Sequence, residues 1–229
     1  MNIRSLVRAV LYKEAIKLRL AWAMLFLGNA AFMAWLFVDV RHLFRLDHPE
    51  VVWYRVIHLG QVHYAPMRFV PLYGALLLAC IQFLPETRDE RLRLSLHLPA
   101  SSNSVVMVHL AAGLFALCIL YLCNIAFLVW LTLLYFPSNV VESMLRTVAP
   151  WMTAGVAGYL GTTLALLEPG LRLRTFILAV TAGLIAPLYD KVPPGAFANA
   201  LPVVASLSPF FLLAALLPAY HFRHRRFDA

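Results

Sequence analysis

Charge is scarce in this chain. Aspartate, glutamate, lysine and arginine make up 13% of its 229 residues, whereas 62% of the residues are hydrophobic. A typical soluble domain carries about a quarter charged residues and has much less apolar surface to bury. The composition therefore excludes an ordinary soluble protein and predicts a membrane protein.

Cysteine is also rare. The three cysteines, Cys80, Cys118 and Cys123, all fall inside apolar runs, where a thiol behaves as a small hydrophobic group. We therefore expect neither a disulfide framework nor a thiolate metal site.

Signatures of catalysis are missing from the sequence as well. It contains no GxxxxGK[ST] phosphate loop, no HExxH zinc motif and no GxSxG nucleophile motif. A b-type haem needs opposed histidines inside the membrane, and His109 alone stands near a suitable depth. Basic residues are spread over several loops without interleaved aromatics, which argues against nucleic-acid binding. We expect a chain that is not itself an enzyme and holds no cofactor.

Apolar runs long enough to cross a bilayer, about 20 residues each, are what the sequence does contain. The runs are Leu20–Val38, Pro66–Leu84, Val105–Phe136, Pro150–Leu167, Leu171–Tyr189 and Leu201–Tyr220. They predict an all-α membrane protein with six transmembrane helices, which form a single transmembrane domain over residues 1–229.

The basic residues predict the orientation of these helices. Thirteen of the 19 lysines and arginines fall on the side of the bundle that carries both termini. By the positive-inside rule, the N- and C-termini are cytoplasmic and the chain lies in the inner (cytoplasmic) membrane. The net charge of +8 then indicates topology and an attraction to anionic lipids.

Residues 1–19 form a basic segment whose apolar residues recur at helical spacing. This pattern favours an amphipathic helix lying flat in the membrane interface; the alternative is a solvated basic leader. The charged positions of the segment are Arg4, Arg8, Lys13, Glu14 and Lys17.

The one sizeable external segment, residues 39–65, is rich in aromatic and β-branched residues and predicts a folded cap of one or two short elements. It carries four histidines, and histidine clusters can bind transition metals. Their spacing matches no recognised ligand pattern, so we do not predict a metal site here. The four are His42, His48, His58 and His63.

Inside the predicted spans, polar residues are isolated. The exceptions are Asn29, Gln82, Asn124 and His109, which do not form a chain of acids resembling a proton relay. The fourth span has small residues at a spacing that lets helices approach closely, either within one subunit or between subunits. Its glycines are Gly155, Gly158 and Gly161.

A charged amphipathic segment, residues 86–104, separates the second and third spans. Within it, leucines alternate with polar residues up to a proline. Charged residues that lie so close to two membrane spans must be at the water interface, where another protein can bind them. The candidate contact residues are Glu86, Arg88, Glu90, Arg91, Arg93 and Pro99.

The order of these parts resembles the permease subunit of a type 2 ABC exporter. In that family a basic interfacial helix with a lysine–glutamate pair, here Lys13-Glu14, precedes the first span. A segment with an acid, leucines, a proline and small polar residues follows the second. The matching residues here are Glu86, Glu90, Leu92, Leu94, Leu96, Pro99, Ser101 and Ser102. Two positions depart from the family: His109 stands where a lysine is common, and Arg91 lies where a glycine is usual.

The resemblance implies a partner and a mechanism. A separate cytoplasmic ABC ATPase would hold the ATP and magnesium, and residues 86–104 would couple this chain to it. A second permease copy or a related permease would complete the transporter. The scarcity of deep charges favours an amphipathic or apolar exported substrate. The alternative is a membrane anchor or assembly subunit of a larger, redox-linked complex that transports nothing.

Overall fold

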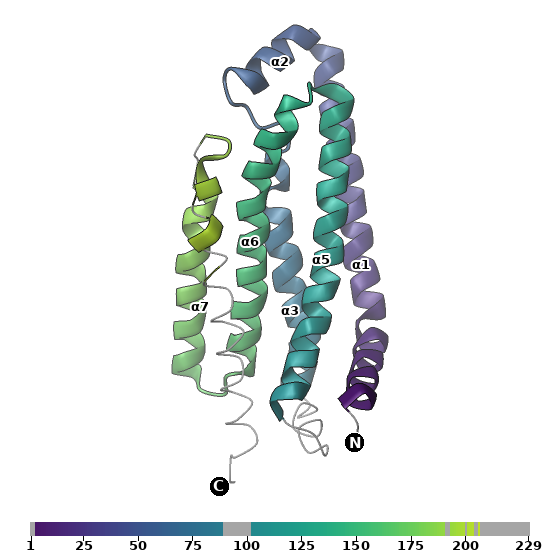
Figure 1. Cartoon of the computed structure of the whole chain (residues 1–229), viewed down its shortest axis with the longest axis vertical. Coiled ribbons are helices and arrows are strands. Elements are labelled where there is room, and N and C mark those ends of the chain that lie inside the picture. The colour runs from purple at the N-terminus through teal and green to yellow at the C-terminus, as the bar shows by residue number, and fades with distance from the viewer. Residues whose placement is uncertain (1–2, 89–101, 191–192, 200, 204–205, 207–229) are drawn as a thin grey trace.

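The computed structural model of the chain describes residues 3–88, 102–190, 193–199, 201–203 and 206 (Figure 1). The described residues form helices and turns, with no strand among them, so the predicted all-α class is confirmed for this part of the chain. The long helices are α1 (Ile3–Leu46), α3 (Val70–Arg88), α5 (Ser102–Tyr135), α6 (Asn139–Leu167) and α7 (Leu171–Ile185). The shorter elements are α2 (Pro49–Ile57) and the 3-10 turns η1 (Ala65–Phe69), η2 (Ala186–Tyr189) and η3 (Ala196–Asn199).

Membrane-spanning helices are confirmed at the level of length and composition. The stretches long and apolar enough are Val7–Leu46, Ala65–Thr87, Val105–Tyr135 and Leu171–Tyr189, and they correspond to the first, second, third and fifth predicted spans. The fourth predicted span lies in α6, which is not among these stretches. The sixth, Leu201–Tyr220, lies almost entirely outside the described residues.

Consecutive long helices run in opposite directions, so their connections alternate between two ends of the bundle (Figure 1). The start of α1, the end of α3, the start of α5 and the turn between α6 and α7 lie at one end, which we call the N-terminal end. The helix α2 and the turn between α5 and α6 lie at the other, which we call the cap end.

The N-terminal segment differs from the expectation of a separate helix lying flat in the interface. Residues 3–19 continue without a break into the first span, as one helix, α1. Val10, Glu14 and Leu18 recur every four residues and are all buried, because residues at that spacing share one helix face. The segment therefore runs alongside the other helices of the bundle, and its Glu14 carboxylate points into the bundle.

The segment 39–65, which we predicted to be external, contains the last two turns of α1 and the whole of α2. An ion pair of 2.6 Å joins Asp47, the residue after α1, to Arg55 of α2. The indole Nε1 of Trp53 donates a hydrogen bond of 2.9 Å to the carbonyl oxygen of Tyr135, at the end of α5. These contacts fasten α2 over the cap end (Figure 1).

Helix α6 lies among α3, α5 and α7, and it packs most extensively against α3. Its glycines face three different neighbours. A β-carbon at Gly155 would clash with the Tyr121 hydroxyl of α5, one at Gly158 would lie 2.8 Å from Leu72 Cδ1 of α3, and one at Gly161 would clash with Thr181 of α7. These close approaches lie within one subunit.

Candidate functional site

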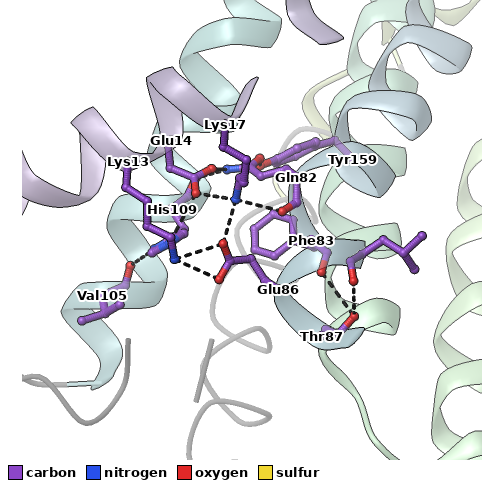
Figure 2. A network of polar contacts seen from close by, with 11 residues as sticks. Lys13, Glu14, Lys17, Gln82, Phe83, Glu86, Thr87, Val105, His109 and Tyr159 are labelled. Atoms are coloured by element: carbon purple, nitrogen blue, oxygen red, sulfur yellow. Dashed lines mark hydrogen bonds and ion pairs between the residues drawn. The ribbon is translucent and has the colours of Figure 1, made fainter. Parts of the chain in front are cut away.

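A buried polar network joins four helices near the N-terminal end of the bundle (Figure 2). Its charged centre consists of Lys13 and Lys17 from α1 and Glu86 from α3. Lys13 Nζ lies 3.0 Å from Glu86 Oε1, and Lys17 Nζ lies 3.1 Å from the same oxygen. Lys17 also contacts Glu14 on its own helix. One carboxylate of α3 thus holds two ammonium groups of α1.

Gln82, one turn before Glu86 on α3, connects this centre to two more helices. Its amide nitrogen donates to Glu14 Oε2 at 2.9 Å and to the His109 carbonyl oxygen of α5 at 2.7 Å. Its amide oxygen accepts a hydrogen bond of 2.7 Å from the Tyr159 hydroxyl of α6. The backbone carbonyl oxygen of Gln82 accepts a further bond, of 3.0 Å, from Lys17 Nζ. Gln82 is therefore the residue through which α1, α3, α5 and α6 meet.

His109 completes the network from α5. Its ring Nδ1 lies 2.8 Å from the Val105 carbonyl oxygen, and because a carbonyl only accepts, Nδ1 carries a proton. The other ring nitrogen, Nε2, faces Glu14 Oε1 at 3.5 Å and has no hydrogen-bond partner among the described residues. His109 thus adds one uncommitted nitrogen to the network.

The stability of this network depends on how deeply its charged side chains are buried. The side chain of Glu86 is fully buried, and those of Lys17 and Lys13 are 15% and 38% exposed. A buried ion needs opposite charge and hydrogen bonds around it, because leaving one charge unpaired costs several kcal/mol. With two carboxylates and two ammonium groups, the network is formally neutral. Its stability depends on keeping that balance.

Metal ligands also gather here. Glu14, Glu86 and His109 can each direct one ligand atom so that all three atoms lie within 4.8 Å of one another. Carboxylates and imidazole are ligands for divalent cations, but Lys17 Nζ already lies between the two carboxylates. The protein's own ammonium therefore occupies the position of a cation, and the residues as arranged fit an ion-pair clamp better than a metal centre.

The predicted contact residues are distributed differently from the expectation of one exposed segment. Glu86 is buried inside the bundle, so its carboxylate faces its own lysines. Arg88 is the last described residue of α3, and Glu90, Arg91, Arg93 and Pro99 lie outside the described residues. In the N-terminal segment, Arg8 is exposed and Arg4 lies in the first turn of α1.

Sequence reasoning noted Gln82 and His109 as isolated polar residues and did not single out Tyr159. A usable signal was present: Gln82 and Glu86 are four residues apart, as are Lys13 and Lys17, so each pair lies on one helix face. A second polar pair lies deeper in the bundle, where Asn29 Nδ2 donates to Asn124 Oδ1 at 2.7 Å. Such interhelical bonds hold membrane helices in register.

The four cap histidines do not gather. Within the described ranges, the three-residue group at the N-terminal end is the one set of histidine, cysteine, aspartate and glutamate side chains with ligand spacing. His63 is buried instead, where it stacks on Phe136 with ring centroids 4.2 Å apart and lies 3.4 Å from Thr132 Oγ1. Burial lowers the pKa of His63 from its usual 6.5 to about 4.

This shift predicts acid sensitivity at the cap end. Between pH 6.5 and 4 the unfolded chain protonates His63 and the folded chain does not, so stability that is fully present above pH 6.5 is lost as the pH falls towards 4. The loss amounts to about 3 kcal/mol at the lower limit. We expect the unfolding temperature in detergent to fall more steeply over this range for the wild type than for His63→Gln. His58→Gln, an exposed position, is the control and keeps the wild-type slope; equal slopes for all three proteins would contradict the assignment.

No protein-family model, curated protein or solved structure matches this chain.

Proposed function

We propose that the chain is the membrane-spanning permease subunit of an ATP-driven ABC exporter whose ATP is hydrolysed by a separate cytoplasmic subunit. The observation that carries this proposal is the position of the buried network. It fastens α3 to α5 and α1 beside the segment 86–104, which begins in the last turn of α3 and ends in the first turn of α5. The segment expected to receive force is thus attached at both ends to helices that are clamped together.

The buried network allows a movement of the segment 86–104 to be transmitted to the helices of the bundle. If the end of α3 were not tied to its neighbours, a displacement imposed on it would be absorbed locally. Because Gln82 and Glu86 tie the end of α3 to α1 and α5, a displacement there moves these helices together. Closure of an ATPase dimer would then reach the membrane half of the transporter as a rigid-body movement, which is a common form of coupled transition.

The positions of the basic residues and the small size of the bundle support the other parts of the proposal, namely the orientation in the membrane and the second permease subunit. The basic residues Arg8, Lys13, Lys17 and Arg19 all lie in the part of α1 nearer the N-terminal end, which supports a cytoplasmic location for that end. A substrate path between two permease subunits supplies a conduit that one small bundle lacks. ATP and magnesium bind to the partner, and the exported substrate is amphipathic or apolar.

Affinity purification from the native host in mild detergent tests this proposal, with mass spectrometry and an ATPase assay as readouts. We expect a stoichiometric ATPase to co-purify with the wild type. The double variant Glu90→Ala, Arg91→Ala should lose that ATPase, or retain it with ATP hydrolysis uncoupled from transport.

A matched control removes one acid and one arginine at the other end of the bundle. Glu142 and Arg146 form an exposed ion pair near the start of α6, and the variant Glu142→Ala, Arg146→Ala should keep the ATPase. Recovery of redox or assembly proteins without any ATPase would contradict the permease function and favour the alternative, a membrane anchor or assembly subunit of a larger complex. Wild-type coupling in the Glu90→Ala, Arg91→Ala protein would remove the coupling role of the segment.

A further inference from the structure

A groove runs along the outside of the bundle between α1 and α5. It has a volume of about 410 Å³, within the range of sites that hold small molecules. Two hollows formed by described residues at the cap end are much smaller, at about 120 and 130 Å³. Apolar side chains from both helices form most of the groove wall: Leu11, Ala15, Leu18, Trp22, Phe115 and Ile119.

The groove opens on the outside of the bundle, where helices that cross a membrane meet lipid. Both of its helices are long and apolar enough to cross a membrane, and Leu11 and Phe115 at its edge are 42% and 70% exposed. Trp22 is held in place by a hydrogen bond of 3.4 Å from its indole Nε1 to the Ala116 carbonyl oxygen of α5. A fixed, hollow apolar wall in this setting fits a hydrocarbon chain.

The charged side chains that line the groove indicate which kind of lipid headgroup would fit there. Arg19 lines the groove, is exposed and makes no ion pair within the described part of the chain. The other charged lining residue, Glu14, is already paired with Lys17 and hydrogen-bonded by Gln82. Side chains on a helix lean towards its N-terminus, so the long arginine side chain can extend towards the headgroup layer at the N-terminal end.

We propose that this groove binds one acyl chain of an anionic phospholipid whose phosphate contacts Arg19. The lipid belongs to the leaflet at the N-terminal end of the bundle, and its binding requires neither an ATPase nor transport. A second copy of the chain is a poorer occupant, because a two-fold interface brings the same patch of both copies together. Arg19 would then face Arg19, which is unfavourable in a medium of low dielectric constant.

Fluorescence of Trp22 measures occupancy of the groove directly. The chain has five tryptophans, so the Trp22 signal is taken as the difference between the wild type and Trp22→Phe. The protein is reconstituted in phosphatidylcholine vesicles with increasing amounts of brominated phosphatidylglycerol, whose bromines quench a tryptophan in contact with the acyl chain. We expect quenching of Trp22 to saturate at a low mole fraction and to be reversed by unbrominated phosphatidylglycerol.

Two variants locate the site. Arg19→Gln should raise the half-quenching mole fraction by about fivefold, the factor expected for one basic residue near an anionic headgroup. Arg41→Gln, on an exposed arginine near the other end of α1, should leave it unchanged. Ala15→Phe fills the groove and should remove the saturable quenching. Ala182→Phe, on an exposed position of α7, should not.

Two outcomes would overturn the proposal. Quenching that rises in proportion to the bromolipid fraction, equally for phosphatidylglycerol and phosphatidylcholine, would show ordinary solvation by lipid. Trp22 that is not quenched in any mixture would show that protein, such as a second copy of the chain, covers the groove.

Discussion

Replacing Glu86 with glutamine is expected to lower the free energy of unfolding by about 3 kcal/mol, a large fraction of the stability of a small domain. The substitution keeps the shape of the side chain and removes its charge. Glu14 then provides one carboxylate against the two ammonium groups of Lys13 and Lys17, and the network carries an uncompensated positive charge in a site where Lys17 is only 15% exposed. Thermal and denaturant unfolding in detergent micelles, followed by tryptophan fluorescence, measures the loss.

The charge balance can be restored without restoring Glu86. In the double variant Lys13→Gln, Glu86→Gln, one ammonium and one carboxylate remain, so we expect it to be more stable than Glu86→Gln alone. The difference between the double variant and the sum of the two single variants gives the coupling energy. Lys13 is 38% exposed and can regain water, which makes its single substitution the milder of the two.

A carboxylate at the cap end provides the comparison for Glu86. Glu142 pairs with Arg146 on the surface of α6, with side chains 71% and 62% exposed, and exposed pairs contribute at most about 1 kcal/mol. Glu142→Gln should therefore behave nearly as the wild type. If Glu86→Gln were no more destabilising than Glu142→Gln, the network would not be the structural clamp that its geometry indicates.

The network also shows which parts of this molecule follow from sequence alone. Helices were predictable because the length of an apolar run is a local property, and four of the predicted spans coincide with long apolar helices. Lys13, Glu14 and Glu86 were all singled out as charged residues, but as members of an interfacial helix and a partner-binding segment. Their mutual contact depends on how α1 and α3 are rotated towards each other, which no local pattern specifies.

The N-terminal segment illustrates the same limit. An amphipathic helix can bury its apolar face in lipid or in protein, and periodicity does not distinguish the two. Here the face that carries Val10 and Leu18 also carries Glu14, and all three are buried. A carboxylate on the apolar face was a usable sign, because an acid there needs a protein partner such as Lys17 or Gln82 and finds none in hydrocarbon.

A single methyl group at Gly161 is expected to destabilise the fold by about 2 kcal/mol, in contrast to its effect at a helical glycine with open space around it, such as Gly183. Glycine to alanine in a helix usually stabilises, by up to about 1 kcal/mol. At Gly161, however, the new β-carbon would overlap Thr181 Oγ1 and Cγ2 and lie 2.8 Å from Thr181 Cβ. Helices α6 and α7 would have to separate, and overpacking of this kind costs about 1–3 kcal/mol. Unfolding in detergent micelles measures the change.

Gly183→Ala is the matched control, because nothing lies within 4 Å of a β-carbon at that position in α7; it should be neutral or slightly stabilising. Adding Thr181→Ala to Gly161→Ala removes the two nearest atoms but leaves the β-carbon, so we expect a partial recovery. This rescue distinguishes packing within one subunit from packing between subunits. If Gly161→Ala kept full stability and instead changed the oligomeric state in size-exclusion chromatography, the glycines of α6 would serve an interface between copies rather than the contact with α7.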